Sequence, residues 1–101
     1  MTQTERIQEM EKLLDQASEA LTAFDEALEE FHRVQDNMQV LDAYYGSQEW
    51  LQDFDDDAAG KLPADLKRGV LSEDTLYDLL TDNKDMFVRL LEMATEYLRK
   101  S

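Results

Sequence analysis

The fold is decided by residues 7–31, which read IQEMEKLLDQASEALTAFDEALEEF. Apolar residues recur in this stretch at steps that alternate between three and four. They are Ile7, Met10, Leu14, Ala17, Leu21, Phe24, Leu28 and Phe31. Residues with this spacing share one face of an α-helix and form the seam of a coiled coil or of a long bundle helix. The stretch therefore predicts a long helix with one apolar stripe.

Residues on both sides extend this helix and mark its ends. Thr2-Gln3-Thr4-Glu5 fits a capping box, in which Thr2 and Glu5 satisfy free backbone N–H groups at the start of a helix. The stripe continues through Val34, Met38, Leu41 and Tyr45, but the step from Phe31 to Val34 breaks the alternation. After such a discontinuity the apolar residues lie on a different side of the helix. We expect one helix over about 3–44, kinked near 33–37, with Gly46 as its stop signal.

Two short helices are predicted in the connection that follows. Ser47 is a suitable N-cap for a helix over about 48–54, which should end where a run of aspartates meets the negative end of the helix dipole. A second short helix is predicted over about 63–68. Pro63 suits its first position and Gly69 lies just past its end.

The last predicted helix covers about 73–99 and is capped by Ser72. Leucine, methionine and aromatic residues form its stripe, with Asn83 as the one polar seam position. Two interpretations of Asn83 stay open: a buried asparagine that fixes the register, or a solvated residue beside a break at residues 81–83.

The two long stripes favour a mutual contact, and no run of residues reads as a strand. The predicted fold is therefore all-α: a long antiparallel coiled-coil-like helical hairpin with one or two short helices in the connection. We expect a single helical domain over residues 1–101.

The charge is strongly negative, with 24 acidic and 10 basic residues and a net charge of -14. Residues 1–57 carry most of it, with 16 acids and 3 bases. Such a field repels phosphate backbones and anionic lipids, so we expect no direct binding to nucleic acid or membranes. The chain has no cysteine, no run long enough for a membrane span and no apolar signal-peptide segment. We expect a cytoplasmic protein.

The segment YYGSQEWL at 44–51, followed by acidic residues and by GKLPADLKRGVLSEDTLYDLL at 60–80, resembles a known family. It is similar to the small, mostly Gram-positive bacterial proteins grouped as domain of unknown function 4298. The resemblance extends over nearly the whole chain. It implies a small helical cytoplasmic protein, and it supplies no catalytic residues.

Acidic residues raise the possibility of a metal site. Asp53, Asp55 and Asp57 match the first three ligand positions of an EF-hand loop, but Ala58 and Ala64 stand where that loop needs glycine and glutamate. A weaker divalent-metal site at these aspartates stays open.

A second set of carboxylates imitates the magnesium ligands of helical nucleotide hydrolases. The set consists of Glu26, Glu29 and Glu30 with Asp82 and Asp85. An acidic helix face produces such spacings without function, and no basic cluster is evident to hold a triphosphate. The single histidine, His32, has no cysteine or second histidine as a co-ligand. We therefore predict no catalytic residues and no cofactor.

The aromatic residues at 44–54 have two interpretations. They could cover the open end of the hairpin as a lid. They could instead form a docking surface, with Tyr45, Trp50 and Phe54 as anchors and Asp55, Asp56 and Asp57 as the charged rim.

The sequence favours a non-enzymatic, acidic helical module that binds another protein or a second copy of itself. One alternative is a divalent-metal binder or a magnesium-dependent nucleotide hydrolase. Another is an acidic antagonist of a basic or nucleic-acid-binding protein.

Overall fold

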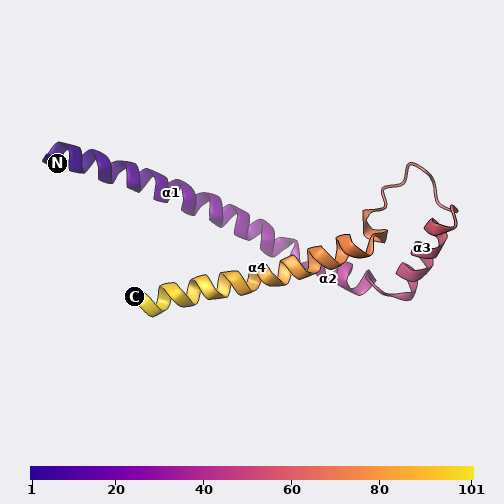
Figure 1. The fold of residues 1–101 in the computed structure, drawn as a ribbon. Coiled ribbons are helices and arrows are strands. Elements are labelled where there is room, and N and C mark those ends of the chain that lie inside the picture. Colours follow the sequence, from indigo (N-terminus) through magenta and orange to yellow (C-terminus); the bar gives the residue numbers. More distant parts are fainter. The chain divides into compact units, whose positions relative to one another are not determined.

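The computed structural model describes residues 1–101 and confirms the all-α prediction, because every regular element is a helix. The elements are α1 (Gln3–Arg33), α2 (Gln35–Tyr44), α3 (Gln48–Ala58), the 3₁₀-helix η1 (Gly69–Leu71) and α4 (Glu73–Lys100), shown in Figure 1. Two long helices thus flank a connection with short helices, as the predicted hairpin requires. The chain divides into two units, Met1–Asp36 and Asn37–Ser101. A single domain over the whole chain remains a prediction.

The first unit consists of α1 and the start of α2. Thr2 is the N-cap of α1, and its side-chain oxygen accepts a hydrogen bond from the Glu5 backbone N–H at 3.1 Å. The Thr2 hydroxyl also donates to the Glu5 carboxylate at 3.1 Å. The Glu5 carboxylate therefore accepts from the Thr2 hydroxyl, whereas in a full capping box it accepts from the backbone N–H of the N-cap residue.

The helix predicted over 3–44 is divided at Val34, inside the region where a kink was expected. The Val34 N–H bonds to the Glu30 carbonyl at 3.0 Å, which closes the last turn of α1. The Gln35 side-chain amide then donates to the Phe31 carbonyl at 3.1 Å. A side chain that takes a carbonyl of the helical ladder competes with the backbone for it and breaks the helix locally.

The second unit has a small core of its own. Trp50, Leu71 and Leu76 are buried, and they come from α3, η1 and α4 respectively. Five half-buried side chains pack against this core: Leu41, Tyr44, Tyr45, Phe54 and Leu62. The chain therefore enters this unit along α2, turns through α3 and η1, and leaves along α4.

The helix α3 begins as predicted but runs four residues further than the expected 48–54. Ser47 caps it by accepting from the Trp50 N–H at 3.1 Å. Its end is a Schellman motif, because the Gly60 N–H donates to the Asp57 backbone carbonyl and the Lys61 N–H donates to the Asp56 backbone carbonyl, both at 3.0 Å. Lys61 and Arg68 form ion pairs with Asp56 and Asp57. These cations offset the repulsion from the helix dipole on which the shorter prediction rested.

The short helix predicted over 63–68 is wrong. After α3 the chain makes a turn at Pro63–Leu66, and the next helical residues are those of η1. The Arg68 guanidinium donates to the carbonyls of Pro63 and Ala64 at 2.8 and 3.4 Å. In a helix these carbonyls would accept the N–H groups of Lys67 and Arg68, so the Arg68 side chain replaces the helical bonds with its own.

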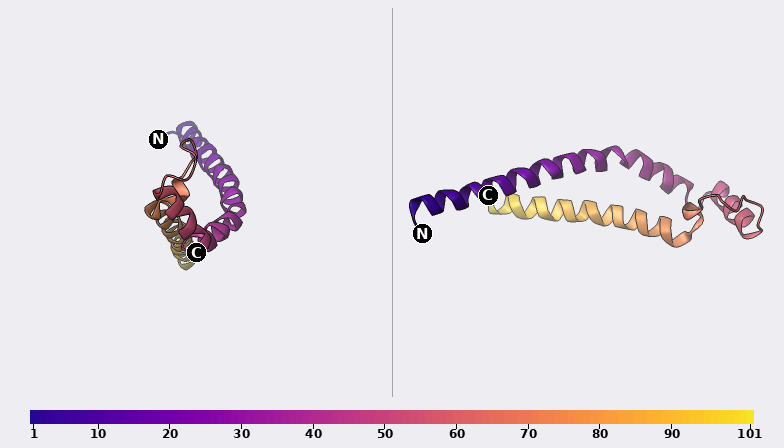
Figure 2. Two further views of the ribbon diagram at one scale, coloured as in Figure 1. Left: turned by 90° about the vertical axis from the view of Figure 1, so that its right-hand side faces the viewer. Right: turned by 90° about the horizontal axis from the view of Figure 1, so that it is seen from above.

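The helix predicted over 73–99 is α4, which Figure 2 shows as one unbroken ribbon. Ser72 caps it by accepting from the Thr75 N–H at 3.4 Å. Glu73 and Asp74 occupy the first turn, and Arg99 and Lys100 the last. The acidic pair lies at the positive end of the helix dipole and the basic pair at its negative end, so both pairs stabilise the helix. Asn83 is half-buried and does not interrupt the helix.

Candidate docking surfaces

Trp50 is the centre of the core in the second unit. Only 5% of its surface is exposed, and its indole N–H donates to the Val70 carbonyl at 2.9 Å. Phe54 stacks on its ring with a centroid distance of 5.3 Å, and Tyr45 meets it edge-on at 5.4 Å. Such ring pairs stabilise beyond the area that they bury. The indole thus joins α3 to η1 through both packing and a hydrogen bond.

This geometry favours the lid interpretation of the aromatic residues. A partner could reach Trp50 only if the core opened, and Tyr45 and Phe54 are half-buried by their contacts with it. Their predicted role as docking anchors remains untested. The observed contacts already account for all three rings as structural residues.

The predicted acidic rim is divided between solvent and internal partners. Asp55 is exposed. Asp56 accepts from the Gln52 amide at 2.9 Å, and Asp57 accepts from the Arg68 guanidinium at 2.7 Å. The Asp57 carboxylate therefore stabilises the connection between α3 and η1, whereas the bond of Asp56 to Gln52 lies within α3.

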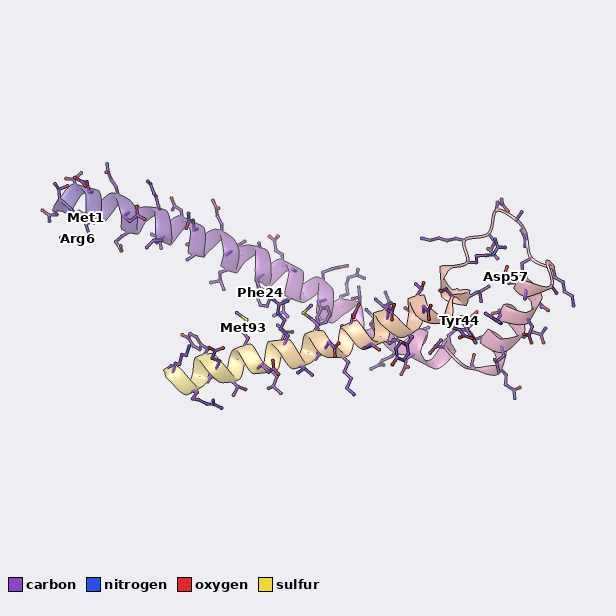
Figure 3. The ribbon with its side chains drawn as sticks, in the orientation of Figure 1. Met1, Arg6, Phe24, Tyr44, Asp57 and Met93 are labelled. Atoms are coloured by element: carbon purple, nitrogen blue, oxygen red, sulfur yellow. The ribbon has the colours of Figure 1, made fainter.

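A side-chain hydrogen bond between α2 and α3 was not foreseen from the sequence. The Tyr44 hydroxyl donates to the Asp53 carboxylate at 2.6 Å. This bond, then burial and the negative charges of Asp53 and Glu49, raise the pKa of Tyr44 to about 12. Figure 3 labels Tyr44 at the end of α2 and Asp57 at the end of α3, which both form side-chain hydrogen bonds that join α3 to its neighbours.

The predicted metal ligands do not assemble into a site. Asp53, Asp55 and Asp57 lie on a helix, where alternate residues point in different directions, whereas an EF-hand needs a loop. No group of three or more Asp, Glu or His side chains has a geometry that could hold a metal ion.

The carboxylates of the hydrolase hypothesis lie in different units. Glu26, Glu29 and Glu30 are on α1, and Asp82 and Asp85 are on α4. Arg33 bonds to Glu30 through two nitrogens, at 2.6 and 2.9 Å, and lowers the pKa of that carboxyl. His32 is exposed in the last turn of α1.

The stripes of the two long helices are mostly uncovered apolar surface. No residue of α1 is buried, and Leu14 and Leu21 are 58% and 72% exposed. The helix α4 contributes only Leu76 to the core, and Leu91 and Leu98 are exposed. Figure 3 labels one stripe residue on each helix, Phe24 on α1 and Met93 on α4. Single exposed leucines are ordinary, but contiguous stripes mark interaction sites.

A pocket of about 370 Å³ lies beside the core of the second unit. Its lining consists of Leu41, Lys67, Gly69, Val70, Thr75, Leu76 and Leu79. Lys67 is the one ionisable residue in this lining, and Thr75 contributes the one side-chain hydroxyl. The pocket therefore offers mainly apolar packing.

The family model described as Domain of unknown function (DUF4298) matches residues 7–93. The chain belongs to this family. The matched residues include most of α1, all of α2 and α3, and most of α4, so the match covers most of both stripes and the core around Trp50. No curated protein and no solved structure matches the chain. None of its helices has the combined length and apolarity that crossing a membrane requires.

Proposed function

We propose that the protein is a non-enzymatic interaction module that binds through the apolar stripes of α1 and α4. One observation carries the proposal: α1 holds a regular apolar seam, yet no residue of it is buried. A helix in water gains most of its stability by packing an apolar face. We therefore expect the stripes to pack against further helices, which act as binding partners.

The core around Trp50 has a supporting role in this proposal. It fixes the turn from α2 through α3 and η1 into α4 by means of the indole bond and the Arg68–Asp57 pair. With the turn held in this way, α4 starts in a defined direction. We include a cytoplasmic location in the proposal, because the resemblance to the family implies one.

Affinity capture with a seam variant and a matched control tests the proposal. Leu14→Ser with Leu21→Ser removes two seam residues, while Gln8→Ser with Glu19→Ser changes two exposed residues away from the seam. Circular dichroism must show that both variants remain helical. We expect the seam variant to lose the bound protein, whether a partner or a second copy, and the control to keep it. Equal binding by both variants would refute the role of the stripes.

A second candidate, an acidic antagonist of a basic protein, is supported by the charge of residues 1–57. Their 16 acids and 3 bases form a field that attracts basic surfaces. A complex of this kind should weaken steeply as salt is raised from 50 to 500 mM, because exposed charges are screened. A complex that is insensitive to salt would exclude this candidate and would favour contact through the stripes.

A further inference from the structure

Both stripes are wider than a contact between two helices requires. In α1, Leu13, Ala20 and Ala27 add a third apolar position to each heptad of the seam. With 100° between successive residues, the stripe covers about 120° of the circumference. Three apolar positions in seven are typical of a helix that faces a core, whereas a two-stranded coiled coil uses two.

The stripe of α4 is wider still. Around Leu90 at its centre, Leu91 lies toward one edge and Met93 toward the other. At the same 100° per residue, the stripe residues between Met86 and Ala94 cover about 160° of the circumference, from Met93 at one edge to Leu91 at the other. Leu91 and Met93 are 68% and 70% exposed. A single neighbouring helix cannot cover both edges, so this stripe needs two.

The chain itself can supply at most one neighbour for each long helix. Its two long helices are α1 and α4, and α2, α3 and η1 are short elements joined to the turn or to its core. The second neighbour of each long helix must therefore come from another molecule.

We propose that this molecule is a second copy of the chain, and that the two copies form a four-helix bundle with two-fold symmetry. The inference rests on the proposed function and names its partner. Each copy contributes two long helices, and each of these helices lacks one neighbouring helix. In a two-fold dimer, a contact between α1 and the α4 of the other copy occurs twice and closes the assembly.

The charges favour this pairing over a contact between two α1 helices. Residues 1–36 carry 10 acids and 3 bases, so two adjacent α1 helices would repel each other. The helix α4 is less acidic, with seven acids and four bases, and all four bases lie in residues 84–100 beside three acids. Lys84, Arg89 and Arg99 form none of the ion pairs in the structure. They are available to the carboxylates of an acidic helix.

The area available is that of a stable interface. The 31 residues of α1 and the 28 of α4 permit a contact about 40 Å long at 1.5 Å per residue. With a width of about 10 Å, one contact between α1 and the α4 of the other copy buries roughly 400 Å² on each of the two helices. The dimer has two such contacts, which together bury roughly 1,600 Å² over both partners, the usual size of a specific protein interface.

Sedimentation equilibrium of the purified full-length protein tests the inference. We expect a mass of twice 11.8 kDa that falls toward the monomer mass on dilution. A monomer at every concentration, or an assembly larger than a dimer, would overturn the proposal. A monomer that still captures another protein through Leu14 and Leu21 would overturn the second copy as partner and leave the proposed function standing.

Two edge variants and one control identify the surface. We expect Leu91→Ser or Met93→Ser to raise the dimer dissociation constant at least about tenfold, because each removes apolar area at one edge of the stripe. Val88→Ser removes apolar area from the same helix outside the stripe, and we expect no change. A dimer that survives both edge variants, or that Val88→Ser weakens equally, would refute the assigned surface. Circular dichroism checks that all three variants remain helical.

Discussion

At the scale of single residues, the second unit is held by a few hydrogen bonds whose loss can be measured. The Tyr44 hydroxyl and the Asp53 carboxylate lie 2.6 Å apart and join α2 to α3. Ionised tyrosine would bring a second negative charge to this site. The protein therefore resists that ionisation in its folded state.

We predict that stability falls as the pH rises from 10 to 12. The pKa of Tyr44 is raised from 10.0 to about 12 in the folded state. Below pH 10 the hydroxyl is protonated in both states and its contribution is complete. Between the two values the unfolded chain releases the proton and the folded chain retains it, so unfolding becomes easier. Urea unfolding at pH 8, 10 and 11.5 measures this loss. Tyr44→Phe should show a smaller decline, and an equal decline in both proteins would contradict the prediction.

Arg68 should contribute more to stability than its neighbour Lys61. Arg68 is half-buried and binds Asp57 at 2.7 Å as well as two carbonyls, so Arg68→Ala should cost about 1.5–3 kcal/mol. Lys61 is exposed and lies 3.9 Å from Asp56, so Lys61→Ala should cost at most about 0.5 kcal/mol. Chemical denaturation of both variants gives the comparison. Similar losses would show that Arg68 does not fix the connection.

At the scale of elements, the end of α3 depends on backbone conformation. Gly60 has a φ of +73°, a value that side chains with a Cβ atom disfavour, and a Cβ there would meet no atom within 4 Å. Gly60→Ala should therefore cost about 1 kcal/mol through backbone strain alone. Gly69 has no positive φ and is equally uncrowded, so Gly69→Ala is the matched control and should cost less. A lower urea midpoint only in the first variant is the expected result.

The elements also show how far the sequence could predict the fold. The caps at Thr2, Ser47 and Ser72 depend on residues within three positions, and the structure has all three. Local spacing likewise predicted the long stripes. The helix over 63–68 was wrong because Arg68 binds carbonyls four and five residues away. The end of α3 was placed too early because Lys61 and Arg68 pair with its aspartates.

The candidate site was harder to predict for the same reason. Trp50 and Phe54 are four residues apart, a spacing that puts both on one face of a helix, and they stack. The spacing could not show that the indole would bond to the Val70 carbonyl, 20 residues away. That distant contact decides whether Trp50 is buried or exposed. The sequence alone therefore left both the lid and the docking surface open as interpretations.

At the scale of the whole molecule, the negative charge is dispersed along the helices without forming a chelating group. We predict that Mg²⁺, Mn²⁺ or Ca²⁺ at 5 mM changes Tm no more than NaCl at matched ionic strength. No group of three carboxylates is arranged to bind a metal, and general screening depends on ionic strength. Differential scanning calorimetry makes this comparison. A rise in Tm specific to one cation, lost in Asp53→Asn, would revive the metal hypothesis.

The position of Trp50 gives the second unit a spectroscopic signal of its own. Trp50 is the chain's one tryptophan and lies in the core of the second unit. Indole emission therefore reports the melting of Asn37–Ser101, while far-ultraviolet dichroism sums the helices of both units. If the two curves coincide on heating, the molecule melts as one cooperative body. If dichroism is lost before the emission shifts, α1 unravels while the indole is still enclosed.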